Sequence, residues 1–283
     1  MSLLRYPGGK NKIRSQLVDE ISNLPGVSGL QYREPFLGGG SVAIAMLESG
    51  VSSVWVNDKD PGMSALWTAV IRKPAELCKM VMSYSPSVES FYSMRDTLRG
   101  LSEEVPDDSA LEIGFAKLAL HQISYSGLGV MSGSPLGGLE QKSQYKIDCR
   151  WYPKTICGKV EKYASLFGST SVHENKCTCL DFESVLSSGE YASYIDPPYY
   201  HKGNELYQFG FTNYDHLRLS RLLRSSNNPW LVSYDDCQEI RDLYSWACIK
   251  TLDVPYTINA SKDRHTGKKA YSSKGELFIT RCT

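Results

Sequence analysis

Strand-like runs that alternate with amphipathic helical stretches constrain the fold of this chain more than any other feature. Runs rich in β-branched and aromatic residues predict strands, and stretches with apolar residues three or four apart predict helices. Strands are predicted at 31–34, 53–56, 170–173, 191–195, 230–233, 248–252 and 276–280, and helices at 11–21, 41–48 and 214–223. The alternation favours an α/β fold with a mostly parallel, doubly wound sheet of seven strands.

The alternation stops between residues 63 and 163. Helices are predicted there at 65–71, 89–98 and 110–121, and a stretch rich in glycine and serine follows at 124–144. Loops longer than about 15 residues without structure of their own are usually functional or disordered. We therefore expect one α/β domain, formed by residues 1–62 and 164–283, with a largely helical insertion at 63–163.

The composition gives no sign of an unusual environment. The net charge of the 283 residues is zero, which by itself does not indicate a polyanionic partner. No apolar run reaches the length of a membrane span, and proline and glycine follow the start too soon for a secretory signal. The eight cysteines include no Cys-x-x-Cys pair. We expect reduced, mostly structural thiols in a cytoplasmic protein.

Basic residues are nevertheless unevenly placed. They gather in two regions, Lys142, Lys146, Arg150, Lys154, Lys159 and Lys162 in the first and Lys262, Arg264, Lys268, Lys269 and Lys274 in the second. Solvated loops are the ordinary explanation of such clusters, and contact with a polyanion is the alternative.

The tetrapeptide Asp196-Pro197-Pro198-Tyr199 follows the predicted strand at 191–195. Open α/β sheets place their ligands at the carboxyl ends of their strands. The Asp196 carboxylate and the Pro197 carbonyl can accept the two hydrogens of an exocyclic amine, and the Tyr199 ring can stack on a heterocycle. The alternative is a turn stiffened by its two prolines, with an incidental acid. Asp196, Pro197 and Tyr199 are therefore the candidate catalytic residues.

A glycine turn at 38–40 follows the first predicted strand, and Asp58 lies about twenty residues beyond it. At this spacing an acid meets ribose hydroxyls, although Asp58 could instead be a helix N-cap or turn residue. The turn lacks the lysine and the glycine spacing of phosphate-binding loops, so a nucleoside without pyrophosphate fits it better. Near the amino terminus, Lys10 could bind a carboxylate or simply face solvent.

Taken together, these segments resemble the Dam-type (D12 class, alpha-group) DNA adenine-N6 methyltransferases over nearly the whole chain. The resemblance rests on five segments in this order: Tyr6-Pro7-Gly8-Gly9-Lys10, Glu34-Pro35-Phe36-Leu37-Gly38-Gly39-Gly40-Ser41, Asn57-Asp58, Asp181-Phe182 and Asp196-Pro197-Pro198-Tyr199. It implies a Rossmann-like class I methyltransferase sheet and S-adenosyl-L-methionine as the methyl donor.

The resemblance also implies the layout of the cofactor site. Tyr6 and Lys10 would approach the methionine end of the cofactor, and Asp58 would hold its ribose. The remaining contacts implied are the pocket lining, Phe36, Gly38 and Gly40, and the adenine contacts, Asp181 and Phe182.

The partner implied is double-stranded DNA, bound by a monomer or weak dimer whose helical insertion is the target-recognition domain. The target adenosine would be flipped out of the helix and stacked on Tyr199. Tyr125 resembles the loop aromatic that fills the vacated space, although it could instead anchor the loop. The expected phosphate contacts are Lys142, Lys146, Arg150, Lys268 and Lys269.

The loop expected to read the target sequence departs from the best-known pattern of the family. Family members that methylate guanine-adenine-thymine-cytosine sites read guanine with an arginine in this loop, and residues 129–132 contain none. A different short motif and weak selectivity both remain open. Two rival functions are an RNA adenine or guanine methyltransferase and a catalytically silent DNA-binding decoy. Intact Asp58, Asp196 and Tyr199 argue against the decoy.

Overall fold

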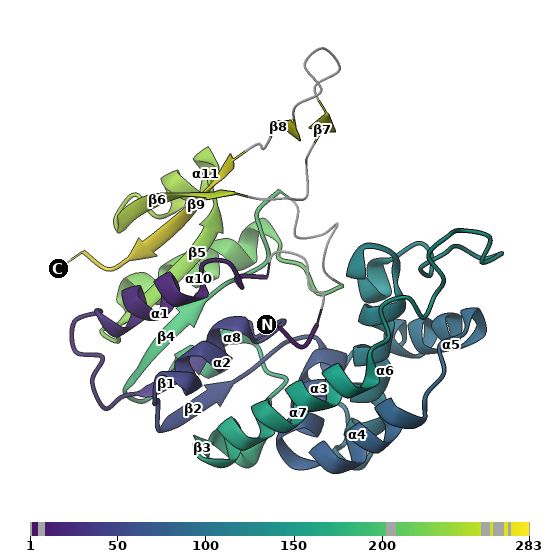
Figure 1. The fold of residues 1–283 in the computed structure, drawn as a ribbon. Helices are drawn as coiled ribbons and strands as arrows, with labels where there is room; N and C mark the ends of the chain where they lie inside the picture. Colours follow the sequence, from purple (N-terminus) through teal and green to yellow (C-terminus); the bar gives the residue numbers. More distant parts are fainter. Residues whose placement is uncertain are drawn as a thin grey trace.

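A seven-stranded sheet with strand order β3-β2-β1-β4-β5-β9-β6 organises the structure (Figure 1). The computed structural model describes residues 2–4, 9–201, 208–255, 261–262, 269–270 and 273–282. Neighbouring strands from β3 to β5 are parallel, and β9 is antiparallel to both β5 and β6. The strands are β1 (Gln31–Glu34), β2 (Ser53–Val56), β3 (Ser171–Val172), β4 (Tyr191–Ile195), β5 (Trp230–Asp235), β6 (Cys248–Pro255) and β9 (Ser273–Thr280). The prediction of seven strands in a mostly parallel sheet is confirmed.

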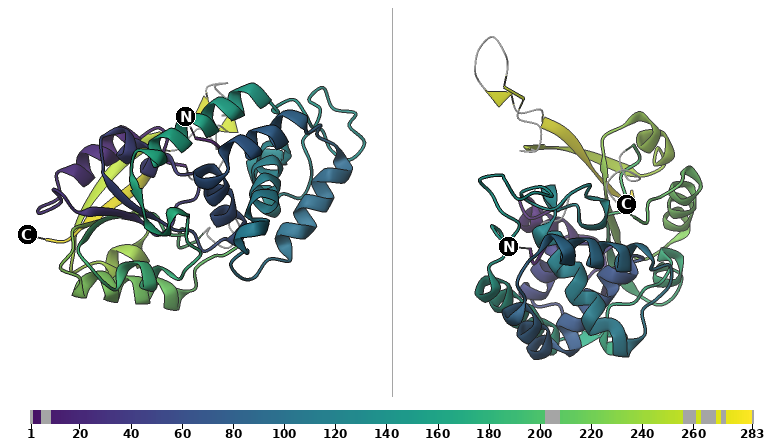
Figure 2. Two further views of the ribbon diagram at one scale, coloured as in Figure 1. Left: turned by 90° about the horizontal axis from the view of Figure 1, so that it is seen from below. Right: turned by 90° about the vertical axis from the view of Figure 1, so that its right-hand side faces the viewer.

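Helices cover both faces of the sheet (Figures 1 and 2). The strand residues alternate between the two faces. Tyr194 and Leu231 pack in one buried cluster with α1 and α2, whereas Ile195 and Val232 pack in a second cluster with α8, α10 and α11. Successive side chains of a strand point to opposite faces, which explains why these strands are apolar throughout. The helices are α1 (Arg14–Ser22), α2 (Ser41–Glu48), α8 (Phe182–Leu186), α10 (Asn213–Ser225) and α11 (Gln238–Leu243).

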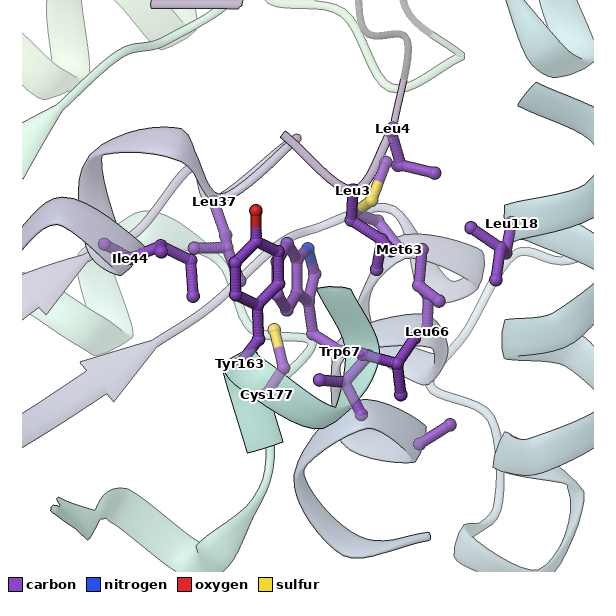
Figure 3. Packing of buried hydrophobic residues seen from close by; sticks show 14 of the residues in the cluster. Leu3, Leu4, Leu37, Ile44, Met63, Leu66, Trp67, Leu118, Tyr163 and Cys177 are labelled. Carbon is purple, nitrogen blue, oxygen red and sulfur yellow. The ribbon is translucent and has the colours of Figure 1, made fainter. Parts of the chain in front are cut away.

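The segment between β2 and β3 is helical, as predicted, and lies to the right of the sheet in Figure 1. It contains α3 (Pro61–Arg72), α4 (Pro74–Ser83), α5 (Val88–Arg99), α6 (Ala110–Ile123) and α7 (Pro153–Gly168), of which α4 and α7 were not predicted. Figure 3 shows Trp67 of α3 beside Tyr163 of α7, with Leu37 and Ile44 next to them. One continuous core therefore joins these helices to the loop after β1 and to α2. The domain boundaries at 63 and 163 stay a prediction.

The stretch rich in glycine and serine after α6 is built on its own hydrogen bonds. It forms two short 3-10 turns, η2 (Tyr125–Gly127) and η3 (Gly129–Met131). The buried Ser124 hydroxyl accepts a hydrogen bond from the Gly129 amide at 2.9 Å, and the Tyr125 amide donates to the Ser134 carbonyl at 3.0 Å. These bonds hold the backbone at Tyr125 without using its ring.

Two features at the C-terminal end differ from the sequence-based expectations. Cys248 of β6 and Cys282 form a disulfide, so the expectation of reduced thiols is wrong for this pair. The register explains it, because Cys248 lies opposite Thr280, two residues before Cys282. In addition, β7 (Ser261–Lys262) and β8 (Lys269–Ala270) form an unpredicted antiparallel pair. Within the described part of the chain, every helix falls short of the length and apolar character of a membrane span.

The close crossing of α3 and α6 depends on Gly114. A Cβ at this position would lie 2.8 Å from the Ala65 carbonyl oxygen and from the Leu66 Cα. We expect Gly114→Ala to destabilise the fold by about 1–3 kcal/mol, although alanine favours helices, because two backbones must move apart. Gly158 in α7 is exposed and a Cβ there meets nothing within 4 Å, so Gly158→Ala should stabilise by about 0.5–1 kcal/mol. Urea unfolding measures the change in stability of both variants. Equal effects of the two substitutions would contradict the close approach of α3 and α6 at Gly114.

Candidate active site

A cavity of about 290 Å³ lies at the carboxyl ends of β1, β2 and β4. The strand order reverses between β1 and β4, and ligands of open α/β sheets bind at such reversals. The residues that line the cavity include Lys10, Phe36, Gly38, Asp58, Lys117, His121, Met131, Asp181, Asp196 and Phe211. The structure thus brings five predicted cofactor residues and Asp196 to one place.

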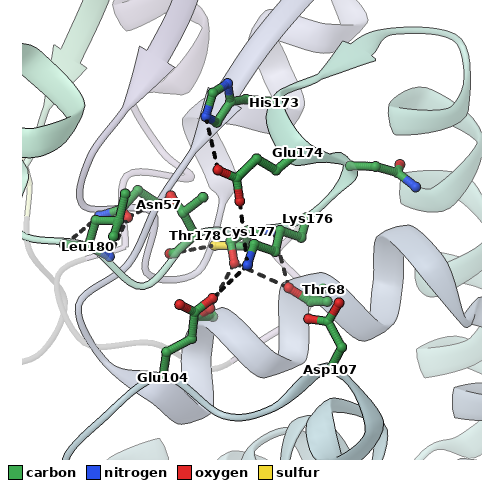
Figure 4. A network of polar contacts seen from close by, with 12 residues as sticks. Asn57, Thr68, Glu104, Asp107, His173, Glu174, Lys176, Cys177, Thr178 and Leu180 are labelled. Carbon is green, nitrogen blue, oxygen red and sulfur yellow. Dashed lines mark hydrogen bonds and ion pairs between the residues drawn. The ribbon is translucent and has the colours of Figure 1, made fainter.

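Asn57 holds together the two loops that carry the predicted cofactor residues (Figure 4). Its side chain is buried, and Nδ2 donates to the Pro35 carbonyl at 2.9 Å and to the Leu180 carbonyl at 3.1 Å. Oδ1 accepts from the Leu180 amide at 2.8 Å and from the Thr178 hydroxyl at 2.7 Å. Every hydrogen-bonding position of the amide is used. Phe36 and Asp181, each next to one of these contacts in sequence, are placed by this clamp.

The glycine turn after β1 is fastened by Trp67 of α3. The Trp67 indole Nε1 donates to the Gly38 carbonyl at 2.9 Å, and Gly38 lines the cavity. Gly40 has a positive φ of 65°, and a Cβ there would overlap the Trp67 ring. Gly40 is not among the described residues that line the cavity. A glycine is therefore required at position 40 because a side chain there would overlap the Trp67 ring.

Asp58 is half-buried, and its carboxylate lies on the cavity wall. Its Oδ2 accepts a hydrogen bond from the Gly38 amide at 2.7 Å, and Oδ1 accepts from the Asp60 amide at 2.9 Å. Burial and the neighbouring Asp60 raise the pKa of Asp58 to about 7. The helix cap at this point is Asp60, which accepts from the amides of Gly62 and Met63. Asp58 therefore makes a turn contact with the Asp60 amide, but the N-cap of α3 is Asp60 and not Asp58.

Three phenylalanines form an aromatic wall. Phe36 lies 5.9 Å from Phe182 and 5.3 Å from Phe211 between ring centroids, and Phe36 and Phe211 line the cavity. Phe182 is buried behind them, with the Arg218 guanidinium over its ring. Asp181 lines the cavity, and its Oδ1 accepts from Arg218 at 2.8 Å. The sequence analysis missed Phe211, which belongs to no recognised motif.

Asp196 is held by a buried ammonium. Lys10 Nζ lies 2.8 Å from Asp196 Oδ1 and 2.8 Å from Glu276 Oε1, and it donates to the Tyr199 hydroxyl at 2.9 Å. Asp196 Oδ1 also accepts from the Ser233 hydroxyl of β5 at 2.9 Å. Lys10 is only 4% exposed, so the solvent-facing alternative is wrong. The sequence analysis missed Ser233 and Glu276, because they neighbour Asp196 only in the folded sheet.

The charges in this cluster depend on one another. Burial raises the pKa of Asp196 above its ordinary value, Lys10 acts against this rise, and Glu276 adds to it. Burial alone would lower the pKa of Lys10, but Asp196, Tyr199 and Glu276 outweigh it and raise that pKa well above its ordinary value. The ammonium is therefore a fixed cation, and it favours the ionised form of the Asp196 carboxyl.

The predicted DNA-contacting residues lie outside this cluster. Tyr125 is 62% exposed, and Lys142, Lys146 and Arg150 are exposed on the same loop between α6 and α7. This exposure disfavours the alternative in which the Tyr125 ring anchors the loop. Tyr6 and Lys268 lie outside the described residues. Lys269 is in β8, and its side chain lies outside them too.

The strand order, with antiparallel β9 between β5 and β6, defines a Rossmann-like methyltransferase fold with its cavity at the carboxyl ends of the parallel strands. Residues 6–258 match the model of the D12 class N6 adenine-specific DNA methyltransferase family. Because the match covers most of the chain, the protein belongs to this family, and the family predicted from the motifs is confirmed.

The chain also resembles two solved structures of the rRNA methyltransferase aviRa from Streptomyces viridochromogenes. Both are 13% identical to it, with TM-scores of 0.45 and 0.44. The alignments cover 99% and 97% of this chain and 89% and 86% of the other. A likeness this distant identifies neither substrate nor mechanism. No match was found among curated proteins.

The raised pKa of Asp58 predicts how stability depends on pH. Between pH 4 and pH 7 the unfolded chain releases this proton and the folded chain keeps it, so Asp58 makes the fold less stable as pH rises. From pH 5 to pH 8 we expect wild type to lose about 2–3 kcal/mol relative to Asp58→Asn in urea unfolding without cofactor. Parallel pH curves for the two proteins would show that Asp58 titrates normally.

Proposed function

We propose that this protein transfers a methyl group from S-adenosyl-L-methionine to N6 of an adenine flipped out of double-stranded DNA. The observation that carries the proposal is the Asp196 carboxylate, held by the buried Lys10 in one cavity with Asp58. The family supports the reaction and the DNA substrate. The contacts around Asp196 support the assignment of the acceptor for the amine.

The donor groups of the cavity fit the proposed cofactor. Ligand pockets commonly measure about 300–1,000 Å³, and this one is near the lower end. The Asp58 carboxylate can accept from ribose hydroxyls, the Phe36 and Phe211 rings offer an aromatic surface, and Asp181 offers a further acceptor. Gly38, Phe36, Asp58 and Asp181 would hold the cofactor, which supplies an electrophilic methyl group on a sulfonium.

Two oxygen atoms are available for the target amine. The contacts of Asp196 with Lys10 and Ser233 both use Oδ1. Among the described residues, no group donates a hydrogen bond to Asp196 Oδ2 or to the Pro197 carbonyl. An exocyclic amine has two hydrogens and so needs two acceptors. Oδ2 and the Pro197 carbonyl are the atoms that we assign to them.

This assignment explains how the site would make adenine N6 reactive. The N6 lone pair is delocalised into the ring, and two hydrogen bonds from the amine to fixed acceptors draw the nitrogen toward tetrahedral geometry. Lys10 favours the ionised form of the Asp196 carboxyl, which is the stronger acceptor. Catalysis by such positioning and electrostatic stabilisation can supply roughly 7–11 kcal/mol. Asp196 acts as an acceptor, and the proton leaves after the transfer.

The loop between α6 and α7 supports a DNA-binding role. Its exposed Tyr125, Lys142, Lys146 and Arg150 offer an aromatic wedge and phosphate contacts, while Met131 of the same loop lines the cavity. Flipping a base costs a few kcal/mol, and stacking on an aromatic ring such as Tyr199 returns about 1–3 kcal/mol per base. Residues 129–132 contain no arginine, which argues against a target sequence whose guanine is read by an arginine of this loop.

Asp196→Ala should lower methyl transfer by at least about 10²–10³-fold, because the amine loses a charged acceptor. Transfer of tritium from labelled S-adenosyl-L-methionine to a DNA duplex measures it, and isothermal titration should show cofactor binding largely intact. The matched control is Asp19→Ala, an exposed aspartate of α1, which should behave as wild type. Near-normal turnover of Asp196→Ala would refute the assigned role. A preference for RNA of the same sequence would favour the RNA methyltransferase instead.

Tyr125→Ala should reduce base flipping, because nothing else on the loop is assigned to fill the vacated space. The fluorescence rise of 2-aminopurine at the target position measures flipping, and we expect it to fall at least about fivefold at saturating protein, with stacking worth 1–3 kcal/mol. Tyr214→Ala, which removes a similarly exposed tyrosine from α10, is the control. An unchanged signal in Tyr125→Ala would leave this tyrosine without a role in flipping.

A further inference from the structure

Glu276 is a buried carboxylate that the sequence motifs and the proposed amine contacts leave unexplained. It lies in β9 between β5 and β6, opposite Asp235 and Leu252, and it is 1% exposed. Its Oε1 lies 2.8 Å from Lys10 Nζ, and the Tyr199 hydroxyl contacts its two oxygens at 3.3 and 3.4 Å. Glu276 thus contacts Lys10, which pairs with Asp196, and Tyr199, which accepts from Lys10. It is not among the described residues that line the cavity.

Stability alone gives no reason for a carboxylate at this position. The next three residues of β9 are buried and apolar, as expected for a strand covered on both faces. Taking a carboxylate out of water costs several kcal/mol, and well-packed apolar residues often stabilise a core as well as a buried ion pair does. Lys10 already has Asp196 as a counterion, and a second carboxylate on the same ammonium repels the first.

We propose that Glu276 is a positioning residue for methyl transfer, which fixes the Lys10 ammonium and the Tyr199 hydroxyl so that Asp196 presents Oδ2 to the target amine. The inference rests on the proposed role of Asp196. Glu276 acts through Lys10 and Tyr199, both of which it contacts directly. With Asp196 bound at Oδ1 by Lys10, an ammonium held at a second point also fixes the direction of the carboxylate.

The charge of Glu276 gives this role a signature in the pH profile. Lys10 carries one positive charge between two carboxylates. The other titratable groups that act on Asp196 are Glu34 of β1, Tyr194 of β4 and Tyr234 of β5, and Asp235 of β5 faces Glu276. The negative charge of Glu276 raises the pKa of Asp196. Removing that charge should shift the acidic limb of the kcat profile to lower pH, while kcat itself falls because Lys10 loses an anchor.

The test compares Glu276→Gln and Glu276→Asp with wild type, and it uses Glu190→Gln, an exposed glutamate just before β4, as control. In Glu276→Gln we expect kcat to fall about 10–100-fold, with KM values for S-adenosyl-L-methionine and duplex DNA within about twofold. The acidic limb should move to lower pH in Glu276→Gln and stay in place in Glu276→Asp, which keeps the charge. In a Lys10→Met background, Glu276→Gln should cause a smaller further loss than it causes in wild type, because only its contact with the Tyr199 hydroxyl remains.

Several outcomes would overturn the inference. A folded Glu276→Gln protein with wild-type kcat, an acidic limb that does not move, or additive losses in the double variant would each leave Glu276 a structural residue. Circular dichroism and melting curves check folding, and if Glu276→Gln is unfolded, Glu276→Asp must show reduced kcat with an unmoved limb. Failure of the proposed function shows separately, as absent methyl transfer by wild type or full activity of Asp196→Ala. In that case the inference is tested without an activity assay, by following the 13C resonance of the Asp196 carboxyl as pH is varied. The pKa of this carboxyl should be lower in Glu276→Gln than in wild type, and an unchanged pKa overturns the inference.

Discussion

The buried ammonium of Lys10 is the interaction on which the site depends. Removing an ion from water costs several kcal/mol, and the carboxylates of Asp196 and Glu276 offset this cost for Lys10. These three residues come from the segment before α1, the loop after β4, and β9, so the ion pairs join parts of the chain that are distant in sequence. At Asp196, the Lys10 ammonium acts against the rise in pKa that burial causes, and it so favours the ionised carboxyl, the stronger acceptor.

Neutral contacts hold the side of the cavity that carries the predicted cofactor residues, here called the cofactor side. Asn57 joins the loop after β1 to the loop before α8 with four hydrogen bonds, and Trp67 fastens the glycine turn through the Gly38 carbonyl. Because Trp67 belongs to α3 and packs with Tyr163 of α7, the helical segment is part of the wall behind the glycine turn (Figure 3). A substitution in these helices can therefore disturb the cofactor side without touching it.

The sequence was sufficient to predict the sheet, because its strands are apolar runs separated by clear helical or turn segments. It predicted the residues after β1, β2 and β4, since carboxyl ends of parallel strands meet at one edge. It did not predict α7. Ile156, Val160, Tyr163 and Phe167 follow a helical period, but the basic residues between them make this stretch read as a cluster of charge. Ser233, Glu276 and the Cys248–Cys282 disulfide could not be predicted, because each depends on which strands are neighbours and in what register.

The helix that leads into the proposed recognition loop also carries part of the charge network around Asp58. Lys117 of α6 lines the cavity and pairs with Asp60, whose charge raises the pKa of Asp58, whereas Lys117 lowers it. Further along the same segment, Met131 lines the cavity close in sequence to the exposed Tyr125. In the proposed function, Lys117 therefore favours the ionised form of Asp58, which is the better acceptor for ribose hydroxyls. One continuous segment would then serve both the cofactor and the DNA, because α6 ends where the loop with Tyr125 begins.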